Sequence, residues 1–117
     1  MVVIVDDDES IRGAIEGLMY AVGLKARAFA SAEEFLDSGV QRTAGCVIAD
    51  MRMPGMSGLE LHEALKAGRR RIPTIIITAH ADEKTRSAAL KAGAAEFVAK
   101  PFDDEALVAT VRAALAS

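Results

Sequence analysis

The stretch VVIVDDDE, from Val2 to Glu9, decides the fold class, because a short apolar run in it ends directly in four acids. The run Val2–Val5 is apolar throughout, which is typical of a strand that is covered on both faces. The acids begin a new element, since Asp8 is a suitable N-cap and Glu9 favours the positive end of a helix. The stretch therefore predicts a buried strand followed at once by a helix.

The same alternation continues along the chain. Further strands are predicted over Lys25–Phe29, Cys46–Ala49, Pro73–Thr78 and Ala95–Ala99. Helices are predicted over Ile11–Val22, after S-x-x-E capping boxes that begin at Ser31 and Ser57, and over Asp82–Ala92 and Asp103–Ala116. Gly23 and Gly93 are expected to end the first and fourth helices. Right-handed crossovers turn this strict alternation into an α/β fold with an open, doubly wound parallel sheet.

Length and composition agree with one globular domain. The chain has 117 residues, 51% of them hydrophobic and 26% charged. Its formal net charge of −3 argues against direct nucleic-acid binding, and the turn expected at Arg69, Arg70 and Arg71 is too short to be a binding run. The single Cys46 excludes an internal disulfide framework and a cysteine-rich zinc site. Without a signal peptide or an apolar run near the ~20 residues of a membrane helix, a cytoplasmic domain with no membrane contact is predicted.

The candidate functional residues follow the predicted strands, where doubly wound sheets bind their ligands. The first strand ends in Asp6 and Asp7, the third in Asp50, the fourth in Thr78 and the fifth in Lys100. Clustered acids repel one another unless a positive group lies among them, and oxygen ligands without nearby Cys or His favour Mg²⁺, with Mn²⁺ as the alternative. Pro101 disfavours helix at Lys100 and so holds its ammonium at the sheet end. Acids, hydroxyl and ammonium together predict a site that handles phosphoryl groups, with one carboxylate as nucleophile.

Four motifs in this sequence resemble the response-regulator receiver domain of two-component signalling. They are VDD at Val5–Asp7, DMRMPGMSG at Asp50–Gly58, ITA at Ile77–Ala79 and KPF at Lys100–Phe102. They stand in the family's order over nearly the whole chain, and the DMRMPGMSG loop resembles the FixJ-type branch of this CheY-like superfamily. The resemblance implies a single receiver domain over residues 1–117, with a flavodoxin-like five-stranded sheet in the order 2-1-3-4-5 and five helices.

The resemblance also implies the roles of the site residues. Asp50 would be the phosphoacceptor that takes a phosphoryl group from a sensor histidine kinase. Mg²⁺ would be held by Asp6, Asp7, Asp50 and the backbone carbonyl of Arg52, with Asp7 a direct ligand and Asp6 mostly acting through water. The phosphoryl oxygens would contact Thr78, Ala79 and Lys100, whose bond to Pro101 is typically cis in this family.

Two further roles concern the signal. Thr78 and Phe97 would form the switch, with Phe97 at the aromatic position that turns inward on activation, where tyrosine is common in this family. Arg52 and His80, each two residues beyond a central site residue, are expected to tune the phosphoryl lifetime on electrostatic grounds. The chemistry would be Mg²⁺-dependent self-phosphorylation and slow self-dephosphorylation rather than enzymatic turnover.

The predicted output surface consists of the fourth helix, the fifth strand and the fifth helix. The helix over Asp82–Ala92 has Leu90 as its only large apolar residue, so it is weakly anchored and suited to move. This surface would serve a homodimer or a DNA-binding output domain, which members of the FixJ-type branch usually carry. The expected result is control of transcription.

A small Mg²⁺-dependent phosphatase of the haloacid-dehalogenase type is the alternative. Asp6-x-Asp8 mimics the D-x-D start of that family, but Ser10 stands where it expects Thr or Val. The later acids Asp103 and Asp104 open a predicted helix, whereas the phosphatases need an acidic pair at a strand end. Steady turnover of a phosphate ester would favour the phosphatase, and a single stoichiometric phosphorylation favours the receiver.

Overall fold

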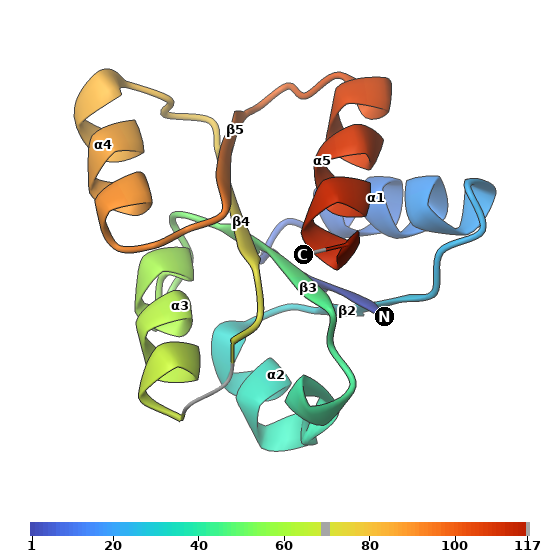
Figure 1. Cartoon of the computed structure of the whole chain (residues 1–117), viewed down its shortest axis with the longest axis horizontal. Coiled ribbons are helices and arrows are strands. Elements are labelled where there is room, and N and C mark those ends of the chain that lie inside the picture. Colours follow the sequence, from blue (N-terminus) through green and yellow to red (C-terminus); the bar gives the residue numbers. More distant parts are fainter. Residues whose placement is uncertain (69–70, 117) are drawn as a thin grey trace.

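The computed structural model describes residues 1–68 and 71–116, and in that part five strands alternate with five α-helices (Figure 1). The parallel sheet has the order β2-β1-β3-β4-β5, as predicted. Its strands are β1 Val2–Val5, β2 Ala26–Phe29, β3 Cys46–Asp50, β4 Thr74–Thr78 and β5 Glu96–Ala99. The helices are α1 Glu9–Ala21, α2 Ala32–Ser38, α3 Gly58–Ala67, α4 Glu83–Lys91 and α5 Asp104–Ala116. A short 3-10 helix, η1 Val40–Arg42, was not predicted, and the turn expected at Arg69 and Arg70 lies outside the described residues.

Strand β1 has its predicted bounds, and the other four strands differ from the prediction by single residues. Strand β3 runs one residue further, to Asp50, because Asp50 still pairs with Ile77 of β4. Strands β2, β4 and β5 each begin one residue later than predicted. In β4 the reason is Pro73, which has no amide hydrogen to donate and joins the sheet only through its carbonyl, which accepts from the Val47 amide at 2.9 Å.

The helix bounds differ from the prediction by one or two residues, except at the end of α5, but the predicted caps at Asp8 and Ser57 are formed. Asp8 caps α1 by accepting from the amides of Ser10 and Ile11, and the capping box of Ser57 and Glu60 is complete. The second predicted box is only half formed. The Ser31 hydroxyl accepts from the Glu34 amide at 3.1 Å, but the Glu34 carboxylate takes the Ala30 amide at 3.0 Å instead of that of Ser31. The amides of Ala30 and Ser31 both precede the helix and have no intrahelical acceptor, so the Glu34 carboxylate can accept a hydrogen bond from either.

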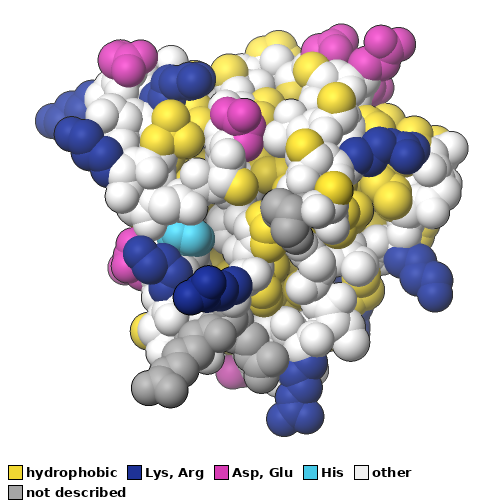
Figure 2. Space-filling view, viewed as in Figure 1, with side chains coloured by type: hydrophobic (Ala, Val, Ile, Leu, Met, Phe, Trp, Pro, Cys, Tyr) yellow, Lys and Arg dark blue, Asp and Glu magenta, His cyan; other side chains and the backbone are white. Residues whose placement is uncertain are grey.

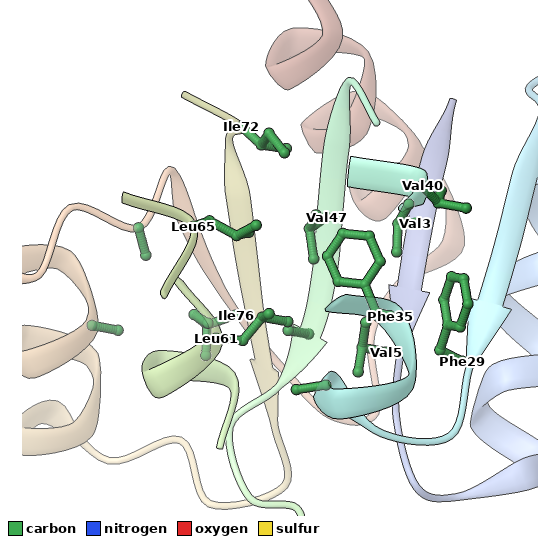
Figure 3. Close-up of a cluster of buried hydrophobic side chains, with 14 of the residues drawn as sticks. Val3, Val5, Phe29, Phe35, Val40, Val47, Leu61, Leu65, Ile72 and Ile76 are labelled. Atoms are coloured by element: carbon green, nitrogen blue, oxygen red, sulfur yellow. The ribbon is translucent and has the colours of Figure 1, made fainter. Parts of the chain in front are cut away.

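Two hydrophobic clusters cover the two faces of the sheet. Helices α1 and α5 lie on one face and α2, α3 and α4 on the other (Figure 1). Figure 3 shows the cluster under α2 and α3, which includes Val3, Val5, Phe29, Phe35, Val47, Leu61, Leu65 and Ile76. The cluster under α1 and α5 includes Ile4, Ile15, Met19, Ile48, Ile75, Leu107 and Val111. Since both faces are covered, a polar ligand can reach the central strands only at their ends.

No helix in the described part of the chain is both long enough and apolar enough to cross a bilayer.

Candidate functional site

Three acids meet at the carboxyl ends of β1 and β3. Asp6 and Asp50 are buried and Asp7 is exposed, and one carboxylate oxygen from each lies within 4.8 Å of the other two. The turn after β1 is held firmly, because Asp6 Oδ1 accepts from the Asp8 amide at 2.9 Å and the Asp6 carbonyl accepts from Arg12 Nη1 at 2.8 Å. The structure thus brings the three acids together at one rim of the sheet.

Lys100 joins two of these acids. Its Nζ lies 3.0 Å from Asp6 Oδ2 and 3.4 Å from Asp50 Oδ2, and its side chain is only 14% exposed. Lys100 follows β5, and the bond to Pro101 is cis, as the resemblance implied. The ammonium is therefore held inside the site, bridging the residue after β1 to the last residue of β3.

Thr78 completes the rim from the strand between β3 and β5. It is the last residue of β4 and is buried, with 1% of its surface exposed. Its Oγ1 accepts from the His80 amide at 3.0 Å, and its carbonyl accepts from the Lys100 amide at 2.8 Å. Ala79 follows directly and is exposed, so its backbone lies next to the same rim.

The charges of the site are not balanced. Burial raises the pKa of Asp50, and the charge of Asp6 raises it further. The Lys100 ammonium and the Arg52 amide, 3.4 Å from Asp50 Oδ1, lower that pKa without cancelling the rise. Burial lowers the pKa of Lys100, but the hydrogen bond to Asp6 and the charges of Asp6 and Asp50 outweigh it, so the net shift is upward. Three carboxylates thus lie together with one ammonium, which contacts two of them, and this oxygen-rich, negatively charged donor set fits Mg²⁺.

The loop between β3 and α3 passes close beneath Asp50. A Cβ on Gly58 would collide with the Asp50 carbonyl oxygen, so only glycine allows α3 to begin here. Sequence reasoning missed this role of Gly58 and also the anchoring bond of Arg12. Their signals were the glycine that closes the DMRMPGMSG motif and a cation one turn inside the first helix.

Three other predicted residues lie outside this cluster. The side chains of Arg52 and His80 are exposed at its border. The pKa of Asp82, which caps α4, is lowered chiefly by the hydrogen bond from the Thr85 amide, and the charge of Arg52 lowers it further. Phe97 is 7% exposed and points into the hydrophobic cluster under α3 and α4, paired in register with Ile76. Its ring therefore lies inward in this structure, below the rim.

Comparisons with known proteins agree with this geometry. The family model of the response regulator receiver domain matches residues 2–112. The chain is 44% identical over 112 residues to the transcriptional regulatory protein FixJ of Azorhizobium caulinodans, and the match covers 96% of this chain and 53% of that protein. It is 41% identical over 115 residues to the response regulator protein TodT of Pseudomonas putida, which covers 98% of this chain and 51% of that protein. The chain thus spans about half the length of these curated relatives.

Solved structures give the same result. The response regulator StyR has a TM-score of 0.90 at 43% identity, with 98% of this chain and 58% of that chain covered. The FixJ-N crystal structure has a TM-score of 0.89 at 36% identity, with 98% and 92% covered. The phosphatase alternative gains no support from these comparisons. Asp103 caps α5, because its Oδ2 accepts from the Ala106 amide at 2.9 Å, whereas the phosphatases need an acidic pair at a strand end.

Proposed function

Because the chain belongs to the response regulator receiver family, we propose that it takes one phosphoryl group from a sensor histidine kinase onto Asp50. The observation that carries the proposal is the bridge of Lys100 between Asp6 and Asp50, with Asp7 beside them. This arrangement joins a buried carboxylate nucleophile to positive and metal-binding groups, which phosphoryl transfer requires.

In the proposed reaction an ionised oxygen of Asp50 attacks the phosphorus of the kinase's phosphohistidine. The new O–P bond gives an acyl phosphate, the P–N bond breaks, and the imidazole that leaves takes a proton from solvent. Lys100, the Thr78 hydroxyl and the Ala79 backbone amide contact the phosphoryl oxygens. Mg²⁺, when bound, supplies further neutralising charge and would be held by Asp6, Asp7, Asp50 and the Arg52 carbonyl, with Asp7 as a direct ligand. Water later hydrolyses the acyl phosphate slowly, at a rate that Arg52 and His80 tune from the border of the site.

The phosphoryl group then acts as a switch. It adds charge and acceptor oxygens, which draw Thr78 and Lys100 inward and alter the space available to Phe97. The receiving surface is the α4–β5–α5 face, where α4 buries only Ala89 and leaves Leu90 39% exposed. Figure 2 shows hydrophobic side chains on this side over β5 and α5, with Lys and Arg side chains toward α4.

The proposed output is control of transcription. The relatives of about twice this length include proteins named as transcriptional regulators, and a change on the α4–β5–α5 face would control a homodimer or a DNA-binding output domain. The receiver itself does not touch nucleic acid in this proposal, in line with its net charge of −3.

The test of the switch uses Lys100, whose ammonium would follow the phosphoryl group. Two unit charges ~4 Å apart interact by ~4 kcal/mol at an effective dielectric of ~20. Loss of the Lys100 cation should therefore change how the protein responds to a bound phosphoryl group. Wild type, Lys100→Ala and Lys100→Arg are saturated with beryllofluoride and Mg²⁺, and amide chemical shifts around Phe97 are compared. We expect beryllofluoride to bind Lys100→Ala without producing the chemical-shift changes that it produces in wild type. Lys100→Arg should recover these changes only in part, because the planar guanidinium of arginine does not replace a compact ammonium.

Lys25→Ala is the matched control, because it removes an exposed cation next to the far end of β2. The full wild-type shift pattern in Lys100→Ala would show that the ammonium does not connect the site to the α4–β5–α5 face.

A further inference from the structure

The outer turn of the loop between β3 and α3 is tied to a different helix. Glu33, in the first turn of α2, accepts a hydrogen bond on Oε2 from the Met56 amide at 3.0 Å. Gly55 lies against the same carboxylate, and a Cβ there would come within 2.7 Å of Glu33 Oε2. Gly55 has a φ of +77°, a backbone conformation that favours glycine, and the absence of a side chain lets the Glu33 carboxylate lie against it.

The first turn of α2 does not itself use the Glu33 carboxylate. Ser31 accepts from the Glu34 amide, and the Glu34 carboxylate takes the Ala30 amide. A negative charge at this position is favourable to the helix in any case, because it faces the positive end of the dipole. The hydrogen bond to Met56 therefore plays no part in capping α2. It joins Glu33 to a loop residue 23 positions further along the chain.

The inner part of this loop starts from the Met51 amide, which donates to the Ile77 carbonyl at 2.8 Å, and two longer hydrogen bonds follow it. The Arg52 amide lies 3.4 Å from Asp50 Oδ1, and the Gly58 amide lies 3.4 Å from the Met51 carbonyl oxygen. Both are longer than the Glu33 bond, in which the Met56 amide lies 3.0 Å from a carboxylate oxygen. Of these three bonds beyond Met51, the one to Glu33 of α2 is therefore the shortest.

We propose that Glu33 is a positioning residue of the phosphorylation site. By holding Met56, it fixes the turn at Pro54 and Gly55 and, through it, the backbone carbonyl of Arg52. The part of this inference that concerns Mg²⁺ rests on the proposed function, in which that carbonyl is a metal ligand. A ligand that is held in place before binding avoids the cost of ordering when the cation arrives.

The test compares three variants with wild type. Glu33→Ala removes the acceptor, Glu33→Gln keeps an acceptor oxygen without the charge, and Asp37→Ala removes a charge from an exposed site on the same helix. The measurements are hydrogen exchange of the Met56 amide without Mg²⁺ and the Mg²⁺ dissociation constant from a chemical-shift titration. In Glu33→Ala we expect exchange at Met56 to be roughly threefold to tenfold faster, the factor that a typical net hydrogen-bond contribution gives. Mg²⁺ binding should weaken severalfold in the same variant, with Glu33→Gln nearer to wild type and Asp37→Ala unchanged.

Each outcome decides the inference. Unchanged Met56 exchange in Glu33→Ala would show that the carboxylate does not hold the loop. Faster exchange with wild-type Mg²⁺ affinity would show that the tie exists but does not position the Arg52 carbonyl, which also overturns the proposal. If wild type itself binds no Mg²⁺, the proposed function fails, and the metal-free exchange rates still decide whether Glu33 fixes the loop.

Discussion

Asp50 carries its charge against two physical costs, which are its burial and the neighbouring carboxylate of Asp6. Both raise its pKa, and the ammonium of Lys100 offsets them only in part. The proposed nucleophile must nevertheless be ionised to attack phosphorus. The ionised form of Asp50 therefore destabilises the metal-free fold, and a bound cation would remove part of that destabilisation.

This cost predicts a pH dependence of stability. A carboxyl whose pKa is higher in the folded than in the unfolded state stabilises the fold fully below the unfolded pKa, and this contribution is lost as pH rises through the folded pKa. In chelator-treated protein we expect Asp50→Asn to remove that loss, so its thermal midpoint should exceed that of wild type increasingly from about pH 4 upward. Thermal unfolding across this range tests the expectation, with the exposed Asp37→Asn as the control. A constant difference between Asp50→Asn and wild type at all pH values would contradict it.

At the scale of elements, α4 is held most firmly at its carboxyl end. His62, buried in α3, lies with Nδ1 3.1 Å from Thr74 Oγ1 and Nε2 3.1 Å from the Ala92 carbonyl oxygen. Ala92 is the C-cap of α4, and the exposed ammonium of Lys66 donates to the same carbonyl at 3.3 Å. Helix α3 therefore fixes one end of a helix that buries only Ala89, which leaves the end near Thr78 freer to move.

We expect His62→Ala to release this end of α4. The Ala92 carbonyl and the Thr74 hydroxyl would lose a partner in a mostly buried place, which costs about 1–3 kcal/mol of unfolding free energy. Chemical denaturation measures this loss, and hydrogen exchange should be faster at Gly93 and Ala94. Lys66→Ala is the matched control, because it removes the exposed bond to the same carbonyl and should cost less than about 0.5 kcal/mol. Equal losses in the two variants would show that the imidazole is not the anchor.

The elements and the strand-end residues could be predicted because their signals are local. Apolar runs, caps and stop glycines each lie within a few residues of the element they define. The hydrogen bonds between distant segments could not be predicted, because they join residues that are far apart in sequence. His62 and Ala92 are 30 residues apart, and Glu33 and Met56 are 23 apart. The reach of the Glu34 carboxylate to Ala30 and the helix η1 likewise emerged only from the structure.

For the whole molecule, the clustered acids predict that Mg²⁺ stabilises the fold. A cation that binds only the native state adds about 1.4 kcal/mol at ten times its dissociation constant. We expect the thermal midpoint of wild type to rise with millimolar Mg²⁺ and expect Asp7→Ala to lose most of that rise. Differential scanning calorimetry at several Mg²⁺ concentrations measures both. An unchanged midpoint in wild type would count against a metal site at these acids.

We propose that the chain accepts one phosphoryl group, and that it accepts this group on Asp50. Intact-mass spectrometry after incubation with Mg²⁺ and a small phosphodonor such as acetyl phosphate tests this most directly. We expect one added phosphoryl group per wild-type chain and none on Asp50→Asn, whose amide is not a nucleophile but keeps the shape of the site. Circular dichroism of the variant establishes that it is folded. An equally labelled Asp50→Asn protein, or steady turnover of the donor without a labelled chain, would show that Asp50 is not the phosphoacceptor.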